Sequence, residues 1–111
     1  MAKYVIRMLP EYMATCLWPV SDNAYDDLGI PIDYETLHLS EKLTEELKRI
    51  DDDVLDIVDW SDPHNESLMS KEERYELLNS GKELLELIRA ELGPDFEVQD
   101  DLDWIVAEFK I

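Results

Sequence analysis

The chain has 111 residues, 28 acidic against 10 basic, and a formal net charge of −18 at pH 7. Hydrophobic residues make up 45% of it, which is enough to bury a core and excludes an acidic disordered tail. A surface with this charge repels nucleic acid and anionic membranes and attracts basic proteins. The composition therefore indicates a protein that binds a positively charged partner, without binding nucleic acid or membranes directly.

The length fits a single domain, residues 1–111, with one core. No apolar run approaches the roughly 18 residues that a membrane span needs. The start of the chain lacks the apolar stretch and cleavage site of a signal peptide. The one cysteine, Cys16, rules out an internal disulfide and fits a reducing compartment. We therefore expect a cytoplasmic protein.

The first third of the chain favours short strands. Residues 4–9 suit a buried strand ended by Pro10, and residues 14–18, just before Pro19, suit a second one. Residues 21–34 are rich in Asp, Asn, Gly and Pro, and their composition is typical of a loop.

Residues 40–60 predict the first helix, with Ser40 as its N-cap. Its apolar residues recur at steps of three and four and form one stripe for burial. These residues are Leu43, Leu47, Ile50, Val54 and Ile57.

A second helix begins at a capping box, in which Ser70 and Glu73 satisfy each other's free backbone N–H groups. Gly93 and Pro94 provide its stop. Gly81 in the helix interior costs about 1 kcal/mol relative to Ala, so we expect it to mark a close approach to a neighbouring element.

Residues 96–99 and 105–109 alternate in the manner of strands and predict a hairpin with an acidic tip. The tip residues are Asp100, Asp101 and Asp103. The chain as a whole predicts an α+β domain, in which two main helices pack on a small, mostly antiparallel sheet.

Acidic residues of the first helix gather opposite its apolar stripe, within roughly 60° of one another. This ridge consists of Glu41, Glu45, Asp52, Asp56 and Asp59, widened by Asp51 and Asp53. A solvated face with pairs such as Glu45 and Arg49 is one explanation. Carboxylates near a helix C-terminus oppose the helix dipole, however, by roughly 0.3–1 kcal/mol each. The pattern therefore favours partner binding, with Trp60 as an aromatic anchor beside the carboxylates.

The acidic tip is a second candidate surface. Turns favour Asp for local hydrogen bonding, so a structural explanation has more weight there.

The sequence offers little for catalysis or metal binding. The acidic runs lack the central Gly and the spacing of a calcium loop. His38 at a helix entry, His64 in a polar loop and Cys16 beside apolar neighbours form no nucleophile–base set. We expect no enzyme, no cofactor and no metal site.

Three segments carry a family resemblance: Cys16-Leu17-Trp18, then Leu37-His38-Leu39-Ser40-Glu41-Lys42-Leu43, then Glu91-Leu92-Gly93-Pro94-Asp95-Phe96-Glu97-Val98. Their order over residues 16–98 resembles a group of small acidic bacterial proteins, some of them similar to immunity proteins of contact-dependent growth inhibition and other polymorphic toxin systems. The resemblance implies a cytosolic antitoxin that binds a cognate toxin domain, and it transfers no catalytic or binding residues.

The leading hypothesis is an immunity protein that neutralises a basic toxin domain, specifically a nuclease, by stoichiometric binding. Nucleases hold phosphate backbones with Lys and Arg, and opposite charges accelerate capture. Two alternatives remain open at this point: a nucleic-acid mimic that inhibits a DNA-binding protein, and an acidic adaptor within a larger assembly.

Overall fold

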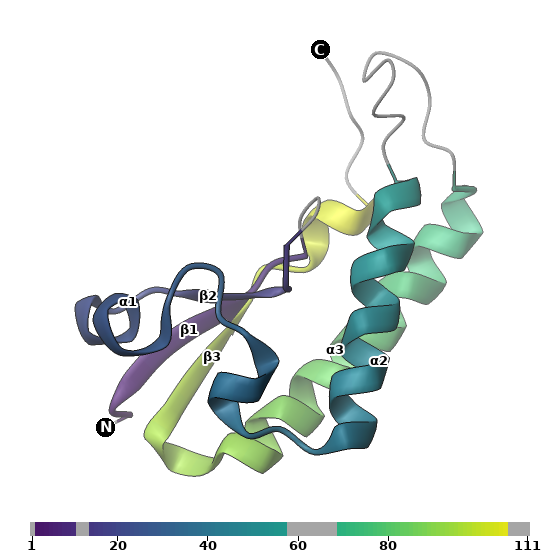
Figure 1. The fold of residues 1–111 in the computed structure, drawn as a ribbon. Helices are drawn as coiled ribbons and strands as arrows, with labels where there is room; N and C mark the ends of the chain where they lie inside the picture. Colours follow the sequence, from purple (N-terminus) through teal and green to yellow (C-terminus); the bar gives the residue numbers. More distant parts are fainter. Residues whose placement is uncertain (1, 11–13, 58–68, 107–111) are drawn as a thin grey trace.

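Three short strands form one sheet in the computed structural model, which describes residues 2–10, 14–57 and 69–106. They are β1 (Tyr4–Met8), β2 (Leu17–Pro19) and β3 (Phe96–Asp100), in the order β2-β1-β3. β1 pairs antiparallel with β2 and parallel with β3. The sheet lies beside two long helices, α2 and α3 (Figure 1), which confirms the α+β class. The parallel pair makes the sheet mixed.

Alternation along the strands decides which face of the sheet is buried. Ile6 and Met8 of β1, Leu17 of β2 and Val98 of β3 all belong to the hydrophobic core. Residues of the opposite face, such as Arg7, remain partly exposed. One face of the sheet is therefore covered and the other is open to solvent.

The two long helices begin where the sequence predicts. α2 (Glu41–Asp53) is capped by the Ser40 hydroxyl, which accepts from the Leu43 N–H at 3.3 Å. A 3₁₀ turn, η2 (Val54–Asp56), follows, and residues 58–60 of the predicted helix lie outside the described residues.

α3 (Lys71–Leu92) starts with the predicted capping box: Ser70 accepts from the Glu73 N–H, and the Glu73 carboxylate accepts from the Ser70 N–H, both at 3.1 Å. The helix ends at Gly93, whose φ of 73° only glycine adopts easily. A 3₁₀ turn, η3 (Gly93–Asp95), leads from there into β3.

The prediction of a loop over residues 21–34 is wrong for its first part. A short helix, α1 (Asp22–Leu28), begins after Ser21, and its Ala24 is fully buried. Residues 29–33 contain no helix or strand, and a 3₁₀ helix, η1 (Tyr34–Leu37), begins at the last residue of the predicted loop. Packing against the sheet overrides the turn-forming composition.

The predicted hairpin is also wrong. After β3 the chain turns into a 3₁₀ helix, η4 (Asp103–Val106), and residues 107–109 lie outside the described residues. Asp100 Oδ1 accepts from the Leu102 N–H at 3.1 Å and starts this turn. Leu102 and Ile105, three residues apart, are both fully buried, so the apolar residues serve a helical turn and not a strand.

Gly81 of α3 is buried at a close approach, as predicted. A Cβ there would lie 3.3 Å from Cδ1 of Leu102, so the close neighbour is the segment after β3. Over the described part of the chain, no helix has the length and apolar character that crossing a membrane requires.

Candidate functional site

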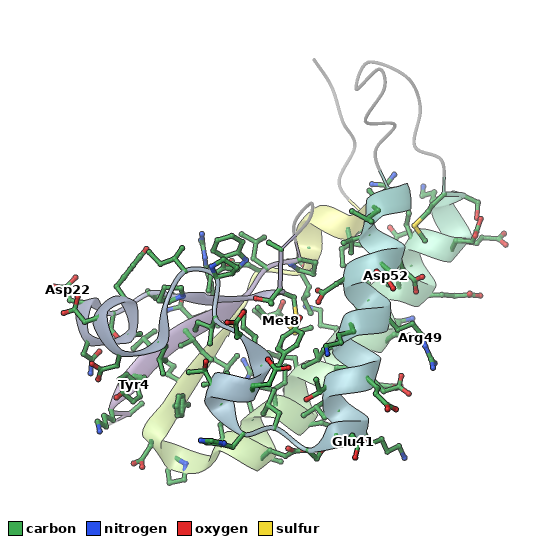
Figure 2. All side chains as sticks on the ribbon, in the orientation of Figure 1. Tyr4, Met8, Asp22, Glu41, Arg49 and Asp52 are labelled. Atoms are coloured by element: carbon green, nitrogen blue, oxygen red, sulfur yellow. The ribbon has the colours of Figure 1, made fainter. Side chains whose placement is uncertain are left out.

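Glu41, Glu45 and Asp52 of the predicted ridge are exposed along α2. Figure 2 labels Glu41, Arg49 and Asp52 on this helix. Asp52 borders a hollow next to η1, whereas Asp53 borders a groove next to α3. The backbone of Asp56 lies in η2, but its side chain, Asp59 and Trp60 lie outside the described residues.

Basic side chains interrupt the ridge on both flanks. Lys48 Nζ lies 3.9 Å from Glu35 Oε1, and Arg49 Nη1 lies 3.6 Å from Glu46 Oε2. Arg49 therefore pairs with Glu46 and not with the Glu45 named in the sequence analysis. Exposed pairs of this kind contribute about 0–1 kcal/mol each, but they dilute the local negative charge.

Basic side chains of the same chain form ion pairs with the acidic tip. Lys82 of α3 forms ion pairs with Asp100 and Asp103, and Arg7 lies 3.8 Å from Asp101. Although partial burial opposes the effect, the Lys82 ammonium holds the pKa of the Asp100 carboxyl below its ordinary value. All three tip residues thus have a cationic partner and a local structural role.

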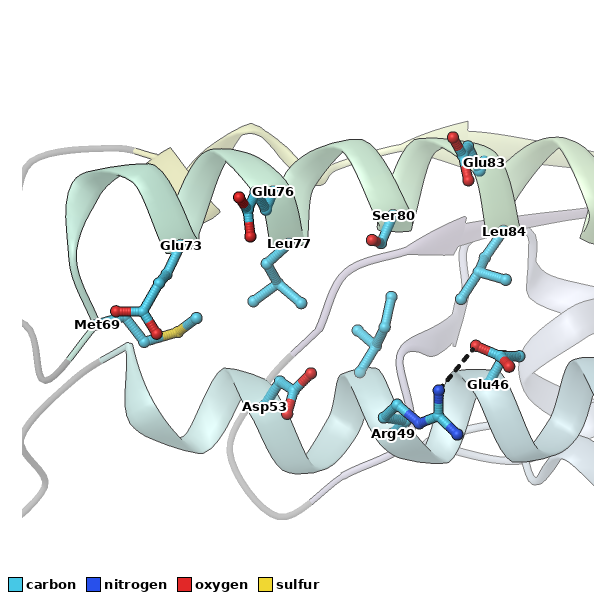
Figure 3. A pocket seen from close by; sticks show the side chains of 11 residues that line it. Glu46, Arg49, Asp53, Met69, Glu73, Glu76, Leu77, Ser80, Glu83 and Leu84 are labelled. Carbon is cyan, nitrogen blue, oxygen red and sulfur yellow. Dashed lines mark ion pairs between the residues drawn. The ribbon is translucent and has the colours of Figure 1, made fainter.

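A groove between α2 and α3 has more carboxylates than basic groups among its described lining residues. The groove has a volume of about 450 Å³ and runs along the seam between the two helices (Figure 3). Its floor is apolar and includes Ile50, Leu77 and Leu84. Its walls carry five carboxylates and one guanidinium: Glu46, Asp53, Glu73, Glu76, Glu83 and Arg49.

Three of the four basic residues of α3 make contacts outside this groove. Arg74 donates to the Ile105 carbonyl at 2.7 Å, Lys82 reaches the acidic tip, and Arg89 donates to the Val98 carbonyl at 2.6 Å. These three side chains therefore bind β3 and the segment after it. Glu73, Glu76 and Glu83 of the same helix line the groove instead.

This arrangement is unfavourable for pairing the two helices. Positions that flank an apolar helix–helix seam usually carry opposite charges, which attract across it. Here Asp53 of α2 and Glu76 of α3 line the same groove. The described seam thus carries carboxylates on both sides of its apolar floor.

Sequence reasoning missed the α3 wall of the groove. Glu73, Glu76, Ser80 and Glu83 lie at steps of three and four residues, next to the buried Leu77 and Leu84. This stripe is visible in the sequence as a helical period, but its pairing with the α2 carboxylates depends on the docking of the helices.

Among the ridge carboxylates that the structure describes, Asp51 turns inward. Its Oδ2 accepts a 2.6 Å hydrogen bond from the Tyr34 hydroxyl, which in turn accepts from the Cys16 N–H at 2.9 Å. Its Oδ1 is buried with no hydrogen-bond partner. Burial raises the pKa of Asp51 from 3.8 to about 6; the Tyr34 hydrogen bond opposes this rise and the Asp52 charge adds to it. Asp51 therefore does not widen the ridge.

The metal-ligating and nucleophilic side chains of the described residues are not brought together. They contain no group of three His, Cys, Asp or Glu side chains placed to hold a metal ion. Burial raises the pKa of the Cys16 thiol to about 12, which keeps it protonated and unreactive at neutral pH. His38 is exposed at the end of η1 with a left-handed backbone, where it ends that turn.

One family model matches the chain, over residues 4–99, and its description is Serratia CdiI immunity protein-like. No curated protein matches. The matched range includes the whole sheet apart from the last residue of β3, both long helices and both walls of the groove.

Proposed function

Because the chain belongs to the family of Serratia CdiI-like immunity proteins, we propose that it is the antitoxin of a contact-dependent growth inhibition system. It acts in the cytoplasm, where it forms a stoichiometric complex with the cognate toxin domain. The observation that carries this proposal, beside the family, is the net charge of −18 on 111 residues. Such a charge attracts a basic partner over long range and accelerates capture.

The toxin domain is a basic nuclease under this proposal. A nuclease needs Lys and Arg to hold the phosphate backbone of its substrate, and these groups complement carboxylates. An acidic inhibitor therefore competes for the same residues or covers their neighbours. Rapid association matters because a free toxin damages its own producer.

The chain inhibits by binding and not by catalysis. The buried Cys16 and the exposed His38 share no contact in the described structure that would make a nucleophile and its base. The proposed contacts are the outward carboxylates of α2 and of the segment that follows it. They include the ridge residues Glu45, Asp52, Asp53, Asp56 and Asp59, with Trp60 as an aromatic anchor.

The tip residues Asp100, Asp101 and Asp103 form a second proposed contact. Their ion pairs with Arg7 and Lys82 weaken their field, so we rank them below the carboxylates of α2.

Co-expression tests the proposal. The toxin domain encoded by the gene next to that of this chain should kill a host on its own and be harmless when this chain is co-expressed. The purified pair should elute as a stable complex, and the chain should abolish cleavage of DNA or RNA at an equimolar ratio. A toxin that binds but cleaves no nucleic acid would refute the nuclease assignment alone. Absence of both protection and binding would refute the antitoxin role.

A further inference from the structure

We propose that the groove between α2 and α3 binds a cationic segment of the toxin. The ammonium and guanidinium groups of its Lys and Arg side chains pair with the groove carboxylates. The inference rests on the proposed function and adds the surface and the chemistry of the contact. It places the main interface at the seam between α2 and α3, and not on the outer ridge of α2.

The shape and lining of the groove fit long basic side chains. Its apolar floor, which includes Ile50 and Leu77, lies between two acidic walls. The alkyl stems of Lys and Arg bury readily on apolar surface while their heads remain at polar rims. Figure 3 shows Glu76 and Glu83 along α3 and Asp53 on the facing helix. A basic segment laid along the seam can therefore meet both walls.

The fold supplies few cations to this groove. Arg49 is the one basic residue among the described side chains that line it, and it pairs with Glu46. The Lys82 and Arg89 side chains of α3 bind the tip and the Val98 carbonyl on the sheet side. The groove thus has an excess of negative charge that a partner can neutralise.

An exposed apolar side chain extends the same face. Leu87 of α3 is 52% exposed and lies seven residues after Ser80, which places it on the groove side of the helix. A partner laid along the seam can use this side chain as an apolar contact next to the acidic walls.

The groove chemistry favours a basic protein over other occupants. A second copy of this chain, at −18, would be repelled, and so would nucleic acid. The described side chains form no cluster suited to a metal ion.

A pair of double variants with the same change in net charge tests the assignment. Glu76→Gln with Glu83→Gln neutralises two groove carboxylates. Asp22→Asn with Asp26→Asn neutralises two exposed carboxylates on α1, at the other end of the molecule (Figure 2). Both pairs weaken long-range attraction equally, so a difference between them reports the local contact.

The probe is the toxin domain encoded by the neighbouring gene, in a catalytically inactive form, with association and dissociation rates measured at two salt concentrations. The groove variant should lose about tenfold or more in affinity, mainly through faster dissociation. The α1 variant should lose less than about threefold, mainly through slower association. Thermal unfolding should show that the groove variant is at least as stable as the parent, because one source of repulsion is removed.

Footprinting provides a second readout that does not alter charge. Ser80→Cys places a thiol on the groove wall, and Gln99→Cys places one on the open face of the sheet, while Cys16 is buried and protected. Bound toxin should slow maleimide labelling at position 80 and leave position 99 unaffected.

The outcomes separate the two proposals. Equal affinity of the two double variants, or protection of position 99 in place of position 80, overturns the groove assignment and leaves the antitoxin role standing. Failure of the parent chain itself to bind the toxin overturns the proposed function and the groove assignment together.

Discussion

Replacing Asp51 by Asn should remove a specific part of the pH dependence of folding. The carboxyl of Asp51 is partly buried beneath η1, accepts one hydrogen bond from Tyr34, and keeps its other oxygen unpartnered. Burial disfavours the charged form, and the pKa rises from 3.8 to about 6 as a result. Asn has the same shape and can still accept from the Tyr34 hydroxyl, but it does not titrate.

The sign of the effect follows from proton binding. Between pH 3.8 and about 6 the folded chain holds a proton on Asp51 that the unfolded chain has released. The free energy of unfolding contributed by this group is therefore greatest below pH 3.8, falls as the pH rises to about 6, and is constant above that. At about 1.4 kcal/mol per pKa unit the full loss is roughly 3 kcal/mol, and partial exposure of the side chain reduces it to about 1–3 kcal/mol.

Denaturant unfolding at pH 4, 5, 6 and 7 measures this loss as the difference between the parent and Asp51→Asn. The Asp51→Asn chain should gain about 1–3 kcal/mol relative to the parent over that range. The other 27 acidic groups titrate in both proteins and cancel. Asp52→Asn is the adjacent comparison: Asp52 is exposed, and loss of its charge should lower the pKa of Asp51 slightly, so its difference from the parent should have the same sign as that of Asp51→Asn and be smaller. Parallel profiles for Asp51→Asn and the parent would refute the burial argument.

Two further substitutions test the packing of α3. Gly81→Leu should lower the free energy of unfolding by about 1–3 kcal/mol or more, because even a Cβ would lie 3.3 Å from the buried Leu102. Asn79→Leu, at an exposed position, is the control. Equal melting temperatures of the two variants would show that α3 and the segment after β3 can move apart. Ser70→Ala should lower the free energy of unfolding by about 1 kcal/mol through loss of the N-cap, since the Ser70 hydroxyl accepts from the Glu73 N–H. The melting temperature should therefore fall below that of the parent. An unchanged melting temperature would mean that the first turn of α3 can fray without loss of stability.

The helices were predictable because their signals are local. The apolar period of α2 and the capping residues of α3 act within one or two turns of chain, so no tertiary information is needed to recognise them. The strand over residues 4–8 was predictable for the same reason, since alternation and the following Pro10 are local features.

Elements decided by packing were not predictable. The composition of α1 is that of a turn, and what holds it as a helix is the burial of Ala24 and the docking of Leu28 against the core. Ile105 and Val106 alternate like a strand, yet the turn that Asp100 starts makes them part of η4. In both cases the local preference is weak and contacts distant in sequence decide the outcome.

The candidate site shows the same division between local and distant information. The excess of carboxylates on α2 was readable from the helical period. Which of them are available for a partner was not, because the answer depends on other elements. Tyr34 removes Asp51 from the surface, and Lys82 neutralises the tip. α3 supplies the second wall that turns the flank of Asp53 into a groove.

The distribution of charge shows how a chain at −18 can fold and still attract a partner. Lys82 and Arg89 act on the sheet side, where an uncompensated carboxylate or carbonyl would weaken the core. Repulsion remains at the outer seam, where the buried contacts of Ile50, Leu77 and Leu84 offset it. Salt therefore acts on the two properties in opposite directions: screening relieves the repulsion that opposes folding and weakens the attraction that brings the partner in. Under the proposed antitoxin role, the acidic groove contributes to fast capture of the toxin at some expense of folding stability.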